Sequence, residues 1–422
     1  MNRFALFLVF FGTIVTLFGL MQWRLFRLFK AWARRAAHPG RVPVWVARGK
    51  AVLIAVNLLF LLRFAYSELG GYDSPLVQAL VIYPGAIAFA AIVLAFLVVS
   101  VRDLALLVWS GLTALTVRLR PAPAAGDRAA DESGAEFDAD RRRFLKVAGI
   151  AAAGSLGAVP AISAAATARD YAINRITLSL PGLPSGLNGL TLAQISDIHS
   201  GMFMTERNMR EIFERVNALH PDMIVMTGDQ VDNADSQIEP LHRALEMLRA
   251  EQGVHAVLGN HDHYATAPKV AAAMRDRGIN VLTNEHRILR INGESMAIVG
   301  VDDEGKGDRN FADLQGALTG VDPQMFSVLL THRPDVFRQS KRAGVDLTLA
   351  GHTHGGQVGI QMYGINLNPV YLVYDYAKGL YLEQDRYLYV NVGVGMVGVP
   401  IRLVRPEISL FTLTSGPAAL PA

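Results

Sequence analysis

Three long apolar runs near the beginning of the chain restrict its fold more than any other feature. They cover residues 4–21, 44–62 and 76–101. Each run is close to the length that a helix needs to cross about 30 Å of hydrocarbon, and Pro84 is a candidate kink in the last one. From about residue 170 onward, acids, bases and glycines are spread throughout, as in a soluble domain. The sequence therefore predicts a helical membrane region over residues 1–118, followed by a domain in water.

A shorter apolar segment, residues 104–117, leaves the number of spans open because it contains serine, glycine and threonine. It lies at the membrane surface, continues the preceding helix or forms a fourth span. The loop over residues 24–50 carries eight basic residues and no acid, which by the positive-inside rule places it in the cytoplasm and the N-terminus outside. Three spans then return Arg102 and Arg118 to the cytoplasm, whereas a fourth would export them.

Two segments separate the membrane region from the domain. Residues 119–140 combine proline and alanine with scattered acids, a composition typical of a flexible linker. Residues 141–168 begin with three arginines and continue as a weakly apolar stretch, which resembles a twin-arginine export signal, cleaved or retained. A further transmembrane helix is the alternative. Both interpretations place the domain of residues 169–422 on the extracytoplasmic side of a bacterial-type inner or plasma membrane.

Charge and cysteine content exclude two classes of site. Nine basic residues and no acid fall in the first 50 positions, so the net charge of +3 for the whole chain leaves about −6 for the remainder. A basic surface for nucleic acid is therefore not expected on the domain. The chain contains no cysteine, so any metal must be held by His, Asp, Glu or Asn.

From residue 188 onward, short apolar segments alternate with amphipathic ones, the pattern of a layered α/β domain. A cluster of polar residues follows each predicted strand, at the end where open α/β sheets present their ligands. The predicted strands are residues 190–195, 223–226, 254–258, 326–330 and 347–349, and the predicted helices are one that Thr205 caps and one over residues 238–248. The clusters are Ser196-Asp197-Ile198-His199, Gly228-Asp229-Gln230-Val231-Asp232, Gly259-Asn260-His261-Asp262, Thr331-His332 and Gly351-His352-Thr353-His354.

Together these clusters resemble the motifs of the calcineurin-like metallophosphoesterase family: D-x-H, G-D-x-x-D, G-N-H-D/E, a lone H and G-H-x-H. The resemblance covers residues 188 to about 412. It implies a four-layer α/β/β/α sandwich and a phosphoric ester hydrolase with two divalent metal ions, for which Mn, Fe, Zn and Mg are all candidates. One histidine after a strand is weak evidence, whereas five such clusters in this order are highly specific.

The resemblance also implies a role for each residue of the site. The metal ligands are Asp197, His199 and His354 for one ion, Asn260, His332 and His352 for the other, and Asp229 as the bridge. Two such ions neutralise phosphate charge and activate a water or hydroxide for in-line attack. His261 is implied to contact the phosphate and protonate the leaving oxygen, with Asp232 orienting its ring.

Two neighbours of this loop have open roles. Asp262 is part of the pocket or a side chain that stabilises the loop, and His263 is a candidate for lining the pocket because it follows the same motif. Surface positions are expected for the remaining histidines.

Further motifs resemble the membrane-tethered branch of the family, which includes twin-arginine-exported members and the transmembrane protein with metallophosphoesterase domain. They are Gly351-His352-Thr353-His354-Gly355-Gly356-Gln357, Tyr376-Ala377-Lys378-Gly379-Leu380-Tyr381, Asn391-Val392-Gly393 and Pro400-Ile401-Arg402. The leading hypothesis is hydrolysis of a phosphodiester or pyrophosphate bond in a lipid-linked or membrane-associated substrate. The apolar residues 358–374 then form a membrane-facing or acyl-contacting rim, or else a hairpin packed on the core.

Two other functions stay open. Some members of this branch are similar to UDP-2,3-diacylglucosamine pyrophosphohydrolases of lipid A synthesis, but that precursor is made in the cytoplasm and the predicted topology puts the site outside. The chain is alternatively a membrane receptor or transport-associated protein with a regulatory phosphoesterase domain. Against this, the predicted spans lack the charged residues that mark ion pathways.

Overall fold

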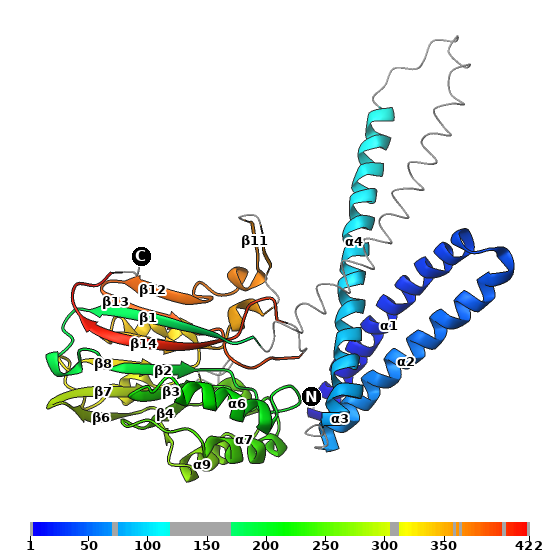
Figure 1. The fold of residues 1–422 in the computed structure, drawn as a ribbon. Helices are drawn as coiled ribbons and strands as arrows, with labels where there is room; N and C mark the ends of the chain where they lie inside the picture. The colour runs from blue at the N-terminus through cyan, green and yellow to red at the C-terminus, as the bar shows by residue number, and fades with distance from the viewer. Residues whose placement is uncertain are drawn as a thin grey trace. The chain divides into compact units, whose positions relative to one another are not determined.

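A computed structural model describes residues 3–69, 75–118, 170–303, 312–357, 360–362, 365–398 and 402–419. The chain divides into two compact units, one helical and one α/β (Figure 1). The predicted linker (119–140) and the signal-like segment (141–168) lie outside the described residues, and so they stay predictions.

The predicted apolar runs are all helical. The helices over residues 3–118 are α1 (Arg3–Ala36), α2 (Val42–Leu69), α3 (Pro75–Val77) and α4 (Tyr83–Arg118), with a 3-10 turn over Pro39–Arg41 and a π-helical turn over Gln78–Ile82. Segment 104–117 lies inside α4, so it continues the preceding helix. Pro84 stands at the start of α4, directly after the π-helical turn. The distortion expected there is thus confined to one turn, where the missing proline N–H disturbs the helical hydrogen bonds.

Inside the helical unit, aromatic rings lie against other aromatic rings, and polar side chains pair with other polar side chains. The ring centroids of Phe60 and Phe89 lie 5.6 and 5.0 Å from that of Phe18. The side-chain amide of Asn57 donates to Gln22 Oε1 at 2.9 Å, and Arg24 forms an ion pair with Asp103.

The outer surface of this unit is apolar: the side chains of Ile54 and Leu107 are each 69% exposed. Within the described part of the chain, one helical segment, Pro39–Leu62, is long and apolar enough to cross a membrane, and none of it is buried. This segment contains the second predicted run. Membrane association is therefore supported, and the number of spans and their orientation stay predictions.

The α/β unit consists of two six-stranded sheets and a small hairpin. Its strands are β1 (Ala172–Leu180), β2 (Thr191–Ile195), β3 (Met223–Thr227), β4 (Val254–Val257), β5 (Asn280–Val281), β6 (Glu285–Ile291), β7 (Glu294–Gly300), β8 (Ser327–Leu330), β9 (Leu347–Ala350), β10 (Ile360–Met362), β11 (Ile365–Leu367), β12 (Gly379–Glu383), β13 (Arg386–Val390) and β14 (Glu407–Ser415). The strand orders are β1-β14-β2-β3-β4-β5 and β12-β13-β9-β8-β7-β6, and β10 pairs with β11. Strands β2 to β5 are mutually parallel, as are β7, β8, β9 and β13.

Side chains from both sheets form a shared core, in which Val225 of the first sheet and Val328 of the second are fully buried. The other face of the first sheet packs on α6 (Glu206–Asn217), α7 (Ile238–Leu245) and α9 (Ala267–Asp276) (Figure 1). The other face of the second sheet packs on the short helices α10 (Leu314–Leu318) and α11 (Phe337–Ser340). The predicted four-layer α/β/β/α sandwich is confirmed.

Local sequence explains the two predicted helices of the unit and one error in them. Thr205 caps α6 by accepting a hydrogen bond from the Asn208 N–H at 3.4 Å, as expected. Helix α7 ends at Leu245, so the predicted end at residue 248 is wrong. Leu248 still packs in the core beneath the first sheet, so burial continues for one turn after the helical hydrogen bonds have stopped.

Candidate functional site

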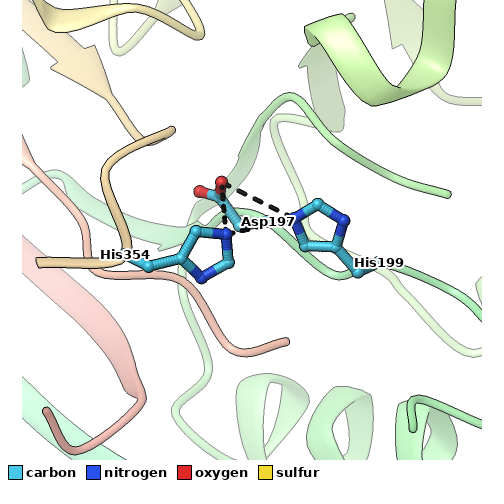
Figure 2. Close-up of side chains that lie close together, drawn as sticks. All are labelled: Asp197, His199 and His354. Atoms are coloured by element: carbon cyan, nitrogen blue, oxygen red, sulfur yellow. Dashed lines mark hydrogen bonds and ion pairs between the residues drawn. The ribbon is translucent and has the colours of Figure 1, made fainter. Parts of the chain in front are cut away.

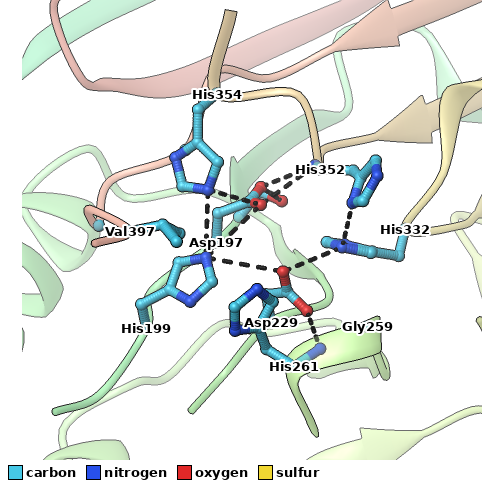
Figure 3. Close-up of polar contacts among 12 residues, drawn as sticks. Asp197, His199, Asp229, Gly259, His261, His332, His352, His354 and Val397 are labelled. Carbon is cyan, nitrogen blue, oxygen red and sulfur yellow. Dashed lines mark hydrogen bonds and ion pairs between the residues drawn. The ribbon is translucent and has the colours of Figure 1, made fainter. Parts of the chain in front are cut away.

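The polar clusters lie at the carboxyl ends of strands from both sheets. Asp197 and Asp229 follow β2 and β3, and Asn260 begins the short helix α8 (Asn260–Tyr264) after β4. From the second sheet, His332 follows β8 and His352 follows β9. Because parallel strands end at the same edge of a sheet and the two sheets pack face to face, these loops meet at one place (Figure 3).

Five of the predicted metal ligands have the left-handed backbone conformation, which is uncommon outside glycine. Their φ angles are 52° at Asp197, 51° at His199, 54° at Asp229, 74° at His352 and 50° at His354. Each such residue costs about 1–3 kcal/mol unless its surroundings hold it in place. Their concentration in these loops indicates that the fold stores strain in order to aim the side chains inward.

Two glycines make the close approach of the loops feasible. At Gly228, with φ of 90°, a Cβ atom would lie 2.5 Å from His332 Nδ1. At Gly351, a Cβ atom would collide with the side chains of Ser196 and Asp197. Any larger residue at these positions would push His332 or Asp197 out of the cluster.

The first group of side chains consists of Asp197, His199 and His354 (Figure 2). The Nε2 atoms of the two imidazoles are 3.1 Å apart, and His354 Nε2 lies 3.4 Å from Asp197 Oδ1. The carboxylate of Asp197 is fixed from behind, because it accepts hydrogen bonds from Ser196 Oγ at 2.5 Å and from the His352 N–H at 3.0 Å. Two ring nitrogens and a carboxylate oxygen therefore converge on one point.

The second group surrounds His332 (Figure 3). Its Nε2 lies 3.1 Å from Asp229 Oδ2, 3.2 Å from Asn260 Oδ1 and 3.1 Å from His352 Nδ1. Its Nδ1 donates to the carbonyl oxygen of Thr227 at 2.9 Å, which fixes the orientation of the ring. Nε2 thus meets two oxygen acceptors, an arrangement that requires a cation or a proton between them.

Asp229 joins the two groups. Its Oδ2 lies 3.1 Å from His332 Nε2 and 3.6 Å from His199 Nε2, and its Oδ1 accepts the backbone N–H of His261 at 2.8 Å. One carboxylate therefore faces both groups and is held by the loop after β4.

His261 lies beside the first group, with its ring centroid 4.6 Å from that of His199. Its Nδ1 donates to the backbone carbonyl of Asp232, which leaves Nε2 for another partner. The Asp232 carboxylate is farther away, with Oδ1 at 3.6 Å from His261 Nδ1 and 3.7 Å from His199 Nδ1. The nearer group that orients His261 is thus the main chain of Asp232.

Burial and neighbouring charges shift the pKa values of these groups in different directions. Burial raises the pKa of Asp197 to about 6. It also acts to raise the pKa of Asp229, but the charge of His332 and its hydrogen bond to this carboxylate outweigh burial and hold that pKa well below its usual range. Burial lowers the pKa of His199 to about 4, so this imidazole is neutral, the form that binds metals.

The ligand chemistry fits divalent cations. Imidazole nitrogens, carboxylates and an amide oxygen are the set that Zn²⁺, Mn²⁺ and Fe accept in proteins. Within the described residues, sets of ligand atoms lie within 4.8 Å of one another in Asp197-His199-His354, in His199-Asp229-His261 and in Asp229-His332-His352. The structure brings every predicted site residue into this cluster, whereas metal identity and number are not determined by it.

Asp262 connects two of the loops. Its carboxylate accepts hydrogen bonds from the backbone N–H groups of Gly259, Gln230 and Val231 at 2.9 to 3.0 Å. This side chain is fully buried. Of the two roles considered for it, the geometry favours stabilisation of the loops.

A pair of acids after β7 was not predicted from the sequence. Asp303 accepts from Arg333 Nε at 2.7 Å, and Asp302 Oδ1 lies 2.8 Å from His263 Nε2. Arg333 Nη1 and the Tyr374 hydroxyl each approach His352 Nε2, at 3.2 and 2.9 Å. A signal was present, because Asp302 and Asp303 follow an apolar strand just as the recognised clusters do.

In the sequence, Arg402 stood out only as part of a motif. In the structure, it contacts a loop next to the metal cluster. Its guanidinium is fully buried and donates to the carbonyl oxygens of Val392, Gly393 and Gly395. The Gly395 N–H in turn donates to the Asp197 carbonyl at 2.8 Å. Arg402 therefore holds the loop that supports Asp197.

Comparison with known proteins identifies the family. The family model for the calcineurin-like phosphoesterase matches residues 190–356. An uncharacterized metallophosphoesterase of Bacillus subtilis, YkuE, is 35% identical over 286 residues, which are 65% of this chain and 98% of that protein. An uncharacterized metallophosphoesterase of Aquifex aeolicus is 34% identical, over 56% of this chain and 88% of that protein.

A relative with a membrane region also matches. The transmembrane protein with metallophosphoesterase domain of Bos taurus is 29% identical over 265 residues, which are 59% of each chain. The resemblance inferred from the five motifs is confirmed by these matches, and with the geometry of the site they lead to one conclusion. This chain belongs to the calcineurin-like metallophosphoesterase family.

Proposed function

We propose that this protein hydrolyses phosphodiester or pyrophosphate bonds with the help of two divalent metal ions. Membership of the family implies a phosphoester hydrolase. The observation that carries the two-metal proposal is the position of Asp229, whose Oδ2 faces His332 on one side and His199 on the other. When bound, such ions neutralise the charge of the phosphoryl group and lower the pKa of a water for in-line attack.

The proposed ligands of one ion are Asp197, His199 and His354, those of the other are Asn260, His332 and His352, and Asp229 is shared by both. Asn260, one of the ligands in the second group, is neutral. It adds no negative charge to the site, which favours binding of an anionic substrate. His332 is oriented by its donation to the Thr227 carbonyl, and His352 by its contact with the Tyr374 hydroxyl, as ligand rings in metal sites usually are.

His261 is proposed to protonate the leaving oxygen. Burial acts to lower its pKa, but hydrogen bonds to Asp232 and the charge of Asp229 outweigh burial and raise the pKa to about 9. The ring is therefore protonated near neutral pH, the state that a general acid requires. Its Nδ1 bond to the Asp232 carbonyl directs Nε2 toward the substrate.

The substrate is proposed to be lipid-linked or membrane-associated, with the domain outside the cytoplasm. The apolar outer surface of the helical unit and the transmembrane relative support a membrane anchor. The eight basic residues over 24–50 support the orientation. Because the chain has no cysteine, one engineered thiol on the domain and a membrane-impermeant reagent test this orientation, and protection of that thiol in intact cells would contradict it.

The proposed activity is tested by cleavage of bis-p-nitrophenyl phosphate by the full chain in detergent, after chelation and after Mn²⁺ is restored. Asp229→Asn removes the shared charge, so we expect turnover to fall by at least about 10³-fold while the domain stays folded. The matched control is Asp222→Asn at the opposite end of β3, where the carboxylate accepts from Thr191 N and Oγ1 at 2.7 Å. Equal turnover in the Asp229 and Asp222 variants would refute the metal assignment.

A further inference from the structure

Arg333 occupies a rigid position at the rim of the metal cluster. It directly follows His332, and its Nε and Nη2 donate to the carboxylate of Asp303 at 2.7 and 3.4 Å. The Asp303 side chain is 2% exposed and that of Arg333 is 12% exposed. A guanidinium gripped in this way by a buried carboxylate loses little further freedom when it binds an anion.

The carboxylate pair at the end of β7 holds a second ring as well. Asp302 Oδ1 lies 2.8 Å from His263 Nε2 and also accepts the backbone N–H of Asp303 at 2.9 Å. Two consecutive residues thus position Arg333, which directly follows His332, and His263, which lies two positions after His261. An ion pair that only stabilises the fold would explain why Asp303 contacts Arg333. It would not explain why the third nitrogen of Arg333 points toward His352.

That nitrogen, Nη1, lies 3.2 Å from His352 Nε2. The other ring nitrogen of His352, Nδ1, faces His332 inside the cluster. The imidazole of His352 therefore stands between the cluster and the guanidinium. Arg333 is therefore separated from the ligand atoms of the second group by one imidazole ring. At this position it can contact a part of the substrate that is next to the reacting phosphoryl group.

Hydrogen-bonding capacity remains at this position. Arginine has five N–H donors, and in the part of the chain that the structure describes, Arg333 donates two of them to Asp303 and has Nη1 next to His352 Nε2. The planar guanidinium matches phosphoryl oxygens and keeps its charge at all relevant pH values. The Tyr374 hydroxyl, 2.9 Å from the same His352 nitrogen, adds a polar group to this side.

We propose that Arg333, clamped by Asp303, binds a second phosphoryl group next to the one that is hydrolysed, so that the site prefers pyrophosphate-linked substrates to simple phosphodiesters. This inference rests on the proposed phosphoesterase function and narrows its substrate class. Asp303 is a positioning residue in this scheme, and Arg333 is the group that contacts the substrate.

The test compares a ligand with one phosphoryl group and a ligand with two. AMP and α,β-methylene-ADP, a hydrolysis-resistant analogue that is called ADP below, are titrated calorimetrically into the full chain in detergent, at a fixed excess of Mn²⁺ that saturates both nucleotides. We expect ADP to bind at least about ten-fold more tightly than AMP, the size of one charge-assisted hydrogen bond in a partly buried site. Arg333→Gln should reduce this ratio to within about two-fold of unity, and Arg333→Lys should retain part of it, because the charge stays but the fork is lost.

The control is Arg338→Gln, which removes an exposed arginine five residues later that pairs with Asp375. We expect its ADP/AMP ratio to equal that of the unmodified protein, and metal content measured in every variant checks that the cluster is intact. No preference for ADP in the unmodified protein, or an equal loss of both affinities in Arg333→Gln, would overturn the proposal.

Cleavage of bis-p-nitrophenyl phosphate by the same preparations separates this inference from the proposed function. Turnover of the diester without an Arg333-dependent preference for ADP would leave the phosphoesterase function standing and refute the second subsite. An Arg333-dependent preference without any turnover would uphold the subsite and count against the hydrolytic function.

Discussion

The helical unit and the α/β unit distribute polarity in opposite ways. In the helical unit, apolar side chains such as Ile54 and Leu107 face outward, while Gln22 and Asn57 bond to each other between helices. In the α/β unit, the apolar side chains form the layers between sheets and helices, and most of the buried Asp and His side chains gather at the carboxyl ends of the strands. The two arrangements suit two solvents, hydrocarbon for the first unit and water for the second.

The comparison also shows what buried polarity is used for in each unit. The side-chain amides of Gln22 and Asn57 donate hydrogen bonds to each other. In the α/β unit, buried Asp229 faces His332 and buried Asp197 faces His354, and each pair requires a cation or a proton between its atoms. Self-satisfied polar pairs hold helices together, whereas convergent polar groups with strained backbones indicate a binding site.

The largest expected effect on stability comes from replacing Arg402, whose guanidinium is fully buried in the α/β unit. Arg402→Met keeps the length of the side chain but removes the donors to three buried carbonyls. The Gly393 carbonyl keeps a hydrogen bond from the Glu407 N–H at 3.3 Å. We therefore expect a loss of about 2–6 kcal/mol in the free energy of unfolding, since each of the two other buried acceptors left without a partner costs about 1–3 kcal/mol. Chemical denaturation measures it. A loss below about 1 kcal/mol would mean that the loop beside Asp197 does not depend on this guanidinium.

A matched pair of substitutions tests whether the two units really face different solvents. Ile54 on α2 and Ile288 on β6 are both exposed, at 69% and 41%. We expect Ile54→Arg to disfavour membrane insertion by about 2.5–3.5 kcal/mol. Ile288→Arg should change stability by less than about 0.5 kcal/mol. The fraction of chain recovered in membranes and the unfolding free energy are the measurements. Equal tolerance at the two positions would contradict the contrast between the units.

The smallest expected effect concerns a surface network in the α/β unit. Glu206 accepts from Arg243 Nε at 2.6 Å and from Arg210 Nε at 2.9 Å. Burial acts to raise its pKa, but the two guanidinium groups outweigh burial and lower the pKa below the usual 4.5. Glu206→Gln should therefore cost about 0.5 kcal/mol of stability at neutral pH.

The pH dependence of that cost has a definite sign. Because the folded-state pKa of Glu206 is lowered, its contribution is fully present above the unfolded pKa and is lost as the pH falls through the folded pKa. Denaturation of both forms between pH 7 and pH 3 should show the difference disappearing on the acid side. A difference that persists in acid would mean that packing, and not charge, is responsible.

Much of the site was predictable because its residues come in short runs. Asp197 with His199 and His352 with His354 are two positions apart, and each run directly follows a buried strand. What could not be predicted is how far each side chain lies from the others. The carboxylate of Asp232, expected to orient His261, is farther from the ring than its own main-chain carbonyl, and such a choice depends on loop geometry.

The pairing of strands that are far apart in the chain could not be predicted from the sequence either. β1 pairs with β14 in parallel, from Ala172 opposite Glu407 to Leu180 opposite Ser415, although nearly the whole domain separates them. No local pattern specifies such a partner, since it is chosen by the packing of the completed sheet. In the same way, Asp303 and Arg333 are 30 residues apart and meet only because β7 and β8 are parallel neighbours.

The sequence by itself determined that this protein combines an apolar helical region with an α/β domain, and which residues follow the carboxyl ends of its strands. Periodicity and apolar length depend on neighbouring residues, so they can be read locally. Only the tertiary structure decided how far Asp229 lies from the ligands on its two sides, that Asp262 stabilises loops, and that Arg333 and Arg402 lie beside the metal cluster. These facts depend on distances between strands of different sheets, which are set when the sheets pack together and not before.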